Sequence, residues 1–144
     1  MATPIPVNQV AFTLGDVLAA TGGAIRGELT GDAAGATGIT TDTRQIRDGQ
    51  AFVALVGEQF DGHDHVAVAV DAGARLVIVE RDVAVPSGAV VVRVESTLVA
   101  LGRLAAWHLE RWRKADSGRR VIAITGSAGK TTTKRAVAAL LEAV

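Results

Sequence analysis

The residues with the clearest chemistry form a phosphate-binding pattern near the end of the chain. Residues 121–124, Val-Ile-Ala-Ile, are a short apolar run that predicts a buried parallel strand. A glycine turn, Lys130-Thr131 and a tail compatible with a helix follow it. In this order, loop N–H groups and the positive end of the helix hold phosphate oxygens, the lysine adds a full charge, and the threonine hydroxyl joins a Mg²⁺ shell. The sequence therefore predicts a loop for the phosphates of ATP.

This loop departs from the general G-x-x-x-x-G-K-[ST] pattern. The pattern needs a glycine five residues before Gly129, where this chain has Ile124, and the glycine stands at Gly126 instead. A surface turn that contains Gly-Lys-Thr by chance is the alternative, but the flanking strand and helix favour a phosphate loop. The residues predicted to bind ATP phosphates are Thr125, Gly126, Ser127, Ala128, Gly129, Lys130, Thr131 and Thr132, and Thr131 is also the predicted Mg²⁺ ligand.

A polar cluster follows a β-branched run in the first half of the chain. Residues 41–44 read Thr-Asp-Thr-Arg and come directly after Ile39-Thr40. By themselves they are a weak functional signal. The residues alone favour a strand end at which Asp42 caps a turn while Arg44 forms an ion pair nearby.

A second polar cluster, residues 57–65, follows the near-continuous apolar run 51–56, which predicts a strand. His63 and His65, with Asp61 and Asp64, could supply metal ligands. However, an i, i+2 pair of histidines suits neither one helix face nor the common zinc spacings, and the chain has no cysteine. A loop in which Asp61 or Asp64 caps the next helix is the favoured interpretation.

Together, residues 41–44, 57–63 and 125–134 resemble the Mur ligases, which build the peptide stem of the bacterial cell-wall precursor. The resemblance covers nearly the whole chain and is to the N-terminal portion of the family. The form T-G-S-x-G-K-T-T-T-K is most similar to the branch that adds D-alanyl-D-alanine. The tripeptide-forming branch, which usually shows T-G-T-N-G-K, stays an alternative. Arg135 stands where the family commonly has Glu, so the role of this position is open.

The resemblance implies a reaction as well as binding surfaces. In the family, ATP phosphorylates the carboxylate of a UDP-N-acetylmuramoyl-peptide, and the amine of D-alanyl-D-alanine attacks the acyl phosphate. Lys130 is the implied catalytic residue, because with Mg²⁺ it would neutralise charge on the transferred phosphoryl group. The residues implied to hold the UDP part of the substrate are Thr41, Asp42, Thr43, Arg44, Glu58, Gln59, Phe60, Asp61 and His63.

The elements that must position these groups predict an α/β fold. Residues 76–79 and 89–94 are predicted strands, and residues 98–114 are the longest predicted helix. One apolar stripe of this helix is predicted to face the core, with His108 structural beside it. The stripe consists of Leu98, Leu101, Ala105, Leu109 and Trp112. Near the start, Thr13 is predicted to cap a helix over residues 14–20, which Gly22-Gly23 ends.

A polar break at residues 115–118 predicts a domain boundary. Residues 1–117 are then a UDP-substrate domain with a small mixed sheet and helices. Residues 118–144 are the first strand, loop and helix of a truncated P-loop ATPase domain. We therefore expect the 144-residue chain to be inactive by itself, and the whole ligase to be a monomer.

Composition limits the remaining classes. With 49% apolar residues, the 144-residue chain can form a core. Its 15 basic and 15 acidic side chains cancel, so there is no electrostatic signature for nucleic acid or anionic lipid. The lack of cysteine, of a signal peptide in residues 1–10 and of a membrane-length apolar run fits a cytoplasmic protein. Two rivals to the ligase are a plain P-loop hydrolase or kinase and a non-catalytic UDP-sugar-binding module.

Overall fold

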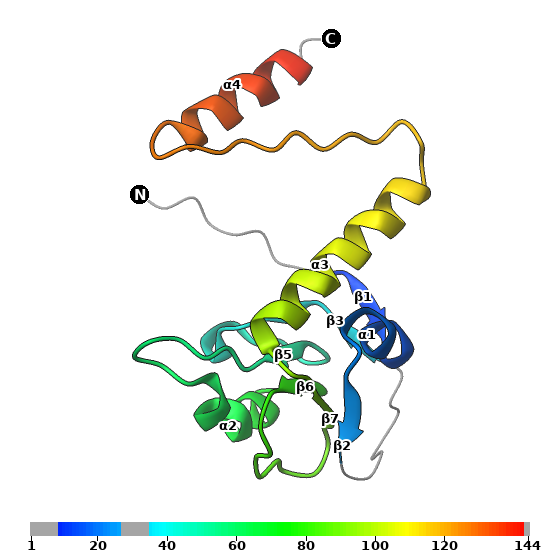
Figure 1. The fold of residues 1–144 in the computed structure, drawn as a ribbon, viewed down its shortest axis with the longest axis vertical. Coiled ribbons are helices and arrows are strands. Elements are labelled where there is room, and N and C mark those ends of the chain that lie inside the picture. Colours follow the sequence, from blue (N-terminus) through cyan, green and yellow to red (C-terminus); the bar gives the residue numbers. More distant parts are fainter. Residues whose placement is uncertain (1–8, 27–34, 143–144) are drawn as a thin grey trace. The chain divides into compact units, whose positions relative to one another are not determined.

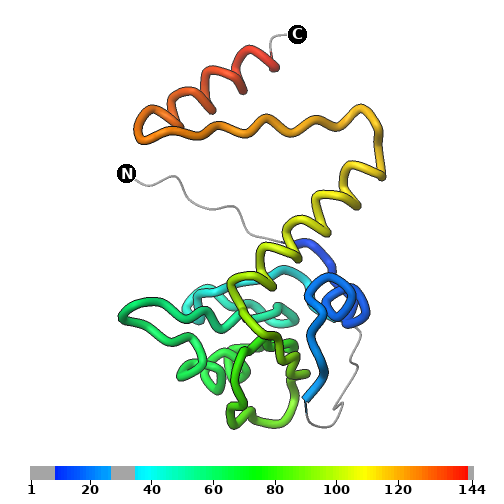
Figure 2. Tube along the Cα trace, viewed as in Figure 1, coloured from blue at the N-terminus to red at the C-terminus, as the bar shows by residue number. Residues whose placement is uncertain are grey.

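The computed structural model describes residues 9–26 and 35–142. It divides the chain into two compact units, Met1–Leu109 and Glu110–Val144, and the path of each can be followed in Figure 2. The first unit contains two sheets and several helices, which confirms the predicted mixed α/β class. The boundary at residues 117/118 stays a prediction, and the absence of a signal peptide concerns residues that lie mostly outside the described ones.

A five-stranded mixed sheet forms the centre of the first unit, in the order β2-β7-β6-β5-β4. Its strands are β2 (Ala24–Arg26), β4 (Ile39–Thr40), β5 (Ala51–Val53), β6 (Leu76–Val79) and β7 (Val90–Arg93). Strands β4 to β7 pair in parallel, and β2 joins β7 antiparallel. All four residues of β6 are buried. This is expected of a central parallel strand, whose two faces are both covered.

Helices cover both faces of this sheet (Figure 1). On one side, Val53 and Ile78 pack in a cluster that includes Val17 of α1 (Leu14–Thr21) and Leu104 of α3 (Thr97–Lys114). The small antiparallel sheet of β1 (Ala11–Thr13) and β3 (Gly35–Thr37) contributes to the same cluster. On the other side, alternate strand residues pack against α2 (Val66–Asp71). Each large apolar side chain buried in this way contributes about 1.5–3 kcal/mol.

The first helix begins and ends as its sequence predicts. The Thr13 hydroxyl accepts a hydrogen bond from the Asp16 N–H at 3.1 Å, and the Asp16 carboxylate accepts one from the Thr13 N–H at 2.9 Å. These reciprocal bonds form a capping box, which satisfies donors that the helix cannot. Gly22 ends the helix in the left-handed conformation, at φ 70°.

The buried face of α3 differs from the predicted one. Its buried residues are Thr97, Ala100 and Leu104, whereas Leu98 is 67% exposed and Leu109 is 37% exposed. Both stripes repeat at three- and four-residue steps, so spacing alone cannot choose between neighbouring faces of the helix. The choice is made by packing, because Ala100 and Leu104 belong to the same core cluster as strand residues such as Ile78.

In the second unit, the predicted strand at residues 121–124 is wrong. These residues have no regular structure, and Val121 and Ile122 are 48% and 59% exposed. A strand needs neighbours that pair with it and cover it, and burial then offsets the backbone ordering cost of about 1–2 kcal/mol per residue. The predicted helix is present as α4 (Lys130–Glu142). No helix within residues 9–26 and 35–142 is long and apolar enough to cross a membrane.

Candidate functional site

The carboxyl ends of three neighbouring parallel strands bring the predicted substrate residues to one edge of the sheet. Strands β4, β5 and β6 are adjacent and parallel. Residues 41–44 follow β4, residues 54–63 follow β5, and residues 80–82 follow β6. Open α/β sheets bind ligands at this edge. The two predicted walls of the UDP pocket therefore start from neighbouring strands.

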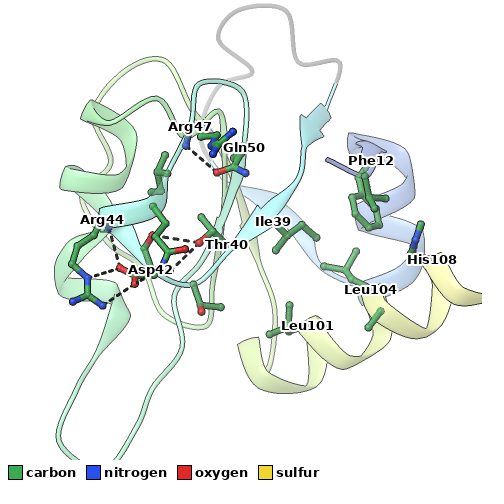
Figure 3. A pocket seen from close by; sticks show the side chains of 15 residues that line it. Phe12, Ile39, Thr40, Asp42, Arg44, Arg47, Gln50, Leu101, Leu104 and His108 are labelled. Atoms are coloured by element: carbon green, nitrogen blue, oxygen red, sulfur yellow. Dashed lines mark hydrogen bonds and ion pairs between the residues drawn. The ribbon is translucent and has the colours of Figure 1, made fainter. Parts of the chain in front are cut away.

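The Thr-Asp-Thr-Arg segment forms a capped turn. Asp42 caps the 3₁₀ helix η1 (Thr43–Gln45), and its carboxylate accepts a hydrogen bond from the Arg44 N–H at 3.0 Å. The guanidinium of Arg44 also donates to both carboxylate oxygens at 2.8 Å, as the dashed lines in Figure 3 show. These contacts to Arg44 lower the pKa of Asp42 to about 2, the guanidinium bonds having the largest effect, and the pair raises the pKa of Arg44. The Arg44 side chain is nevertheless 86% exposed.

A cavity of about 850 Å³ lies beside this turn, within the first unit. Figure 3 shows Asp42 and Arg44 at its polar end and Phe12, Leu104 and His108 at its apolar end. The ring of His108 lies 6.2 Å from that of Phe12, centroid to centroid. The cavity is lined by Val10, Phe12, Ile39, Thr40, Thr41, Asp42, Arg44, Gln45, Ile46, Arg47, Gln50, Leu101, Leu104, Ala105 and His108.

This cavity unites only part of the predicted set. Thr41, Asp42 and Arg44 line it, but Thr43 does not. Glu58, Gln59, Phe60, Asp61 and His63 are all described and none lines it. Its second wall comes instead from α3, so the structure does not bring the two predicted walls together around this one hollow.

The loop after β5 is a short hairpin with a tight turn. Val56 and Asp61 form an antiparallel bridge, and the Gly57 N–H donates to the Phe60 carbonyl at 2.7 Å. Glu58 and Gln59 stand exposed at the tip. The turn thus presents two polar side chains to solvent while its base is held by backbone hydrogen bonds.

His63, by contrast, is buried beneath this turn. Its side chain has no exposed surface, its Nδ1 lies 2.6 Å from an Asp61 oxygen, and its Nε2 accepts the Glu80 N–H at 3.0 Å. Asp61 caps the 3₁₀ helix η2 (Gly62–His65), because it also accepts from the His63 N–H at 2.9 Å. Asp61, one of the two predicted caps, thus caps the 3₁₀ helix that leads into α2, whereas α2 itself has no side-chain cap.

Arg81 completes the cluster around Asp61. It donates to Asp61 at 2.9 Å and to Asp64 at 3.1 Å. The hydrogen bond from Arg81 is the largest of the effects that hold the pKa of the Asp61 carboxyl well below its usual range, and the pairing raises the pKa of Arg81. His65 stacks on Phe60, with ring centroids 5.0 Å apart. Among the described residues, no group of three or more His, Cys, Asp or Glu side chains is arranged to hold a metal ion.

The glycine loop of the second unit leads directly into α4. Gly126 and Gly129 have φ values of 146° and 79°, which side-chain-bearing residues rarely adopt. The Lys130 ammonium donates to the Gly126 carbonyl across the loop. The Thr133 hydroxyl donates to the Gly129 carbonyl at 3.1 Å. Thr125, Ser127, Ala128, Thr131 and Thr132 are all exposed around this turn.

Comparison with known proteins identifies the family. The profile of the Mur ligase family, catalytic domain, matches residues 36–108, which include the ends of β4, β5 and β6. The chain belongs to the Mur ligase family. Within this family, the UDP-N-acetylmuramoyl-tripeptide–D-alanyl-D-alanine ligase of Bacillus subtilis (strain 168) is 44% identical over 105 residues, 72% of this chain and 22% of the relative. A UDP-N-acetylmuramoyl-L-alanyl-D-glutamate–2,6-diaminopimelate ligase of Geobacter sulfurreducens is 38% identical over 118 residues, 82% of this chain and 22% of the relative.

Solved Mur ligase structures agree with this assignment. A crystal structure of MurF from Acinetobacter baumannii has a TM-score of 0.78 at 35% identity, over 96% of this chain and 29% of that one. A MurF ligase from Thermotoga maritima, in complex with ADP, has a TM-score of 0.55 at 35% identity, over 67% of this chain and 21% of that one. The chain therefore spans about a fifth of the length of the curated relatives it matches.

Sequence reasoning missed two parts of this Mur ligase surface. Glu80 and Arg81 contact the loop after β5 from positions about twenty residues further along the chain. A charged pair directly after the apolar run of β6 is the signal that could have found them. Of the α3 residues that line the cavity, Leu101 and Ala105 lie on the predicted stripe and His108 beside it, but the sequence predicted a core role for them and no cavity.

Proposed function

We propose that this chain carries the UDP-substrate surface and the ATP-phosphate loop of a MurF-type ligase. Such an enzyme joins D-alanyl-D-alanine to UDP-N-acetylmuramoyl-tripeptide, and both this substrate and ATP would be met in the cytoplasm. The observation that carries the proposal is the position of residues 41–44 and 57–63 at the carboxyl ends of adjacent parallel strands. The names of the relatives support the choice of reaction.

Arg44 is the residue best placed to meet the diphosphate of UDP. Its guanidinium is exposed, and it already holds a carboxylate with two parallel hydrogen bonds. A phosphate can replace Asp42 in this fork, because the geometry of the two anions is alike. Thr41 and Thr43 precede Arg44 in the same turn and offer hydroxyl groups for the ribose or the uracil edge. The capped turn of residues 41–44 can therefore both stabilise the end of β4 and contact UDP.

The exposed tip of the loop after β5 would form the second side of the substrate surface. Glu58, Gln59 and Phe60 reach solvent there, so amide, carboxylate and aromatic groups are available to a nucleotide. Asp61 and His63 are tied to Arg81 and Glu80 instead. We therefore assign substrate contact to the tip and support to the base of the loop.

The residues of the glycine loop fit ATP phosphates. The left-handed Gly129 directs the chain into the start of α4, where N–H groups and the helix dipole favour an anion. The Lys130 ammonium folds over the loop toward the Gly126 carbonyl, where it would meet a phosphate. The exposed Thr131 supplies one hydroxyl for Mg²⁺. When bound, ATP would supply the phosphoryl group that turns the peptide carboxylate into an acyl phosphate, from which the D-alanyl-D-alanine amine displaces phosphate.

The experiment titrates this chain with UDP-N-acetylmuramoyl-tripeptide by calorimetry. Arg44→Ala should weaken binding by about tenfold to a hundredfold, the value of a hydrogen-bonded charge pair. Arg75→Ala is the matched control, since Arg75 is an exposed arginine that pairs with Asp48 and precedes β6 at the opposite edge of the sheet. Equal affinity in the Arg44 variant and the wild type would show that the pocket lies elsewhere.

A non-catalytic UDP-sugar-binding module is the second candidate. It is favoured by the exposure of Val121 and Ile122, which leaves the phosphate loop without a strand to hold it. This candidate predicts UDP-substrate binding with no use of ATP, even in a longer protein that contains the complete ATP domain. Ligation by that longer protein would exclude it.

A further inference from the structure

We infer that His63 and Glu80 are positioning residues that fix the substrate-facing loop of residues 57–63 to the sheet. This inference rests on the proposed function for the identity of the ligand. It changes the role implied by family resemblance, in which His63 itself contacts UDP. The observations that carry it are the burial of His63 and the partners of its two ring nitrogens.

The hydrogen bonds of His63 leave its ring nothing to offer a ligand. A backbone N–H can only donate, so Nε2 must accept from the Glu80 N–H at 3.0 Å. Nδ1 then carries the ring proton and donates to the Asp61 carboxylate at 2.6 Å. Both nitrogens are therefore used, and the side chain has no exposed surface. His63 joins the loop after β5 to the end of β6.

Glu80 extends this connection to α3. Its carboxylate accepts from the Thr97 N–H at 2.7 Å and from the Thr97 hydroxyl at 3.2 Å. The side chain thus caps α3, while the backbone N–H of the same residue is used by His63. Because Thr97 is buried at the start of an 18-residue helix, the Glu80 N–H has a firmly held position.

Arg81 secures the loop from the solvent side. It bridges Asp61 and Asp64, on the two sides of His63. Besides its backbone hydrogen bonds, the base of the loop is thus held by the buried neutral ring of His63 and by the exposed ion pairs of Arg81. Surface ion pairs contribute little to stability, whereas a buried N–H that loses its acceptor carries the full cost of desolvation. We therefore assign the positioning to His63 and Glu80 rather than to Arg81.

Two substitutions of His63 separate its hydrogen bond to Asp61 from its hydrogen bond to the Glu80 N–H. In His63→Asn, the amide lies near the former Nδ1 and can still donate to Asp61, but it cannot reach Glu80. In His63→Gln, the amide oxygen reaches the former Nε2 and can accept the Glu80 N–H. Asp82→Asn is the control, because Asp82 lies two residues after Glu80 but pairs with Arg93, outside the loop of residues 57–63.

The readouts are UDP affinity and hydrogen exchange of the Gly57 and Gly62 amides, which donate to Phe60 and Leu55 across the base of the loop. We expect His63→Asn to weaken UDP binding about tenfold and to lose protection at both amides, while the β6 amides stay protected. His63→Gln should restore most of both properties, and Asp82→Asn should change neither. If Asn and Gln behave alike, or if His63→Asn binds UDP as the wild type does, the inference is wrong.

Ring-nitrogen NMR of the wild-type chain provides a test that needs no variant. We expect a neutral His63 ring with the proton on Nδ1 and a hydrogen-bonded, unprotonated Nε2. A proton on Nε2 would overturn the inference, because the Glu80 N–H would then have no acceptor. Failure of the wild-type chain to bind UDP, with the expected ring state and amide protection present, would instead overturn the proposed function.

Discussion

Gly62 lies so close to Ala54 that a β-carbon at position 62 would stand 2.9 Å from the Ala54 Cα. The same β-carbon would lie 2.9 Å from both the backbone nitrogen and the carbonyl oxygen of Leu55. All three atoms belong to the backbone and cannot rotate away. The loop of residues 57–63 can therefore return this closely onto the end of β5 because residue 62 has no side chain.

Gly62→Ala should therefore lower the free energy of unfolding by about 1–3 kcal/mol, the usual cost of forced overpacking. Gly102→Ala is the matched control, since a β-carbon there meets nothing within 4 Å in the middle of α3. It should raise stability by about 0.5–1 kcal/mol through helix propensity. Urea unfolding of the two variants provides the measurement. Unchanged stability in Gly62→Ala would mean that the loop does not pack on β5 as described.

The pairing of Asp42 with Arg44 predicts a titration that reports on the site. Folding lowers the pKa of Asp42 from 3.8 to about 2, so the pair contributes to stability above pH 3.8 and that contribution is lost as the pH falls toward 2. Arg44→Ala should raise this pKa part of the way only, because the residue 44 N–H still donates to the carboxylate. Carboxyl NMR titration measures the change, and Arg75→Ala should leave the pKa of Asp42 where it is.

UDP should also raise the pKa of Asp42 if Arg44 moves from this carboxylate to a phosphate. The free and UDP-bound chains can be compared in the same titration. A pKa that stays at about 2 in the complex would show that Arg44 keeps its pairing with Asp42 and does not serve the nucleotide.

The local features of the fold could be predicted because each depends on residues that are close together in the sequence. The apolar run of β6 predicted a buried strand, and Thr13 predicted the start of α1. The packing of α3 was not readable, since adjacent stripes of the helix have the same spacing. The strand predicted at residues 121–124 failed for another reason. An apolar run forms a strand only where neighbouring strands pair with it and side chains cover it, and residues 121–124 have no such neighbours among the described residues.

The sequence motifs identified the residues of the candidate site, but they did not show which residues these contact. The sequence indicated residues 41–44 and 57–63, and the parallel order of β4 and β5 places both at one edge. The role of His63 could not be read in this way, because its Nε2 meets Glu80, which lies 17 residues away in sequence. Partners at such distances are set by tertiary packing, so a motif can indicate that a residue matters without showing what it contacts.

Lys130→Ala should separate the two binding functions. In a protein that contains the complete ATP domain, we expect the ligation rate to fall by at least about a hundredfold, as it does when a preorganised charge contact is removed. UDP-substrate affinity should stay near the wild-type value, because the role proposed for Lys130 concerns ATP phosphates. Lys114→Ala is the control, since Lys114 is an exposed lysine paired with Glu110. Ligation by the Lys130 variant at nearly the wild-type rate would remove this lysine from the mechanism.

The 144-residue chain by itself should not catalyse ligation. The proposed phosphate loop follows residues 121–124, where Val121 and Ile122 are about half exposed and form no strand. Without burial of about 1.5–3 kcal/mol per apolar side chain, the backbone before the loop is not held. The loop N–H groups then have no fixed geometry in which to meet ATP, and electrostatic stabilisation of a transferred phosphoryl group depends on such preorganisation. The assay measures phosphate release from ATP and Mg²⁺ with UDP-N-acetylmuramoyl-tripeptide and D-alanyl-D-alanine. Turnover at an ordinary enzymatic rate of about 1–10³ per second would contradict the prediction.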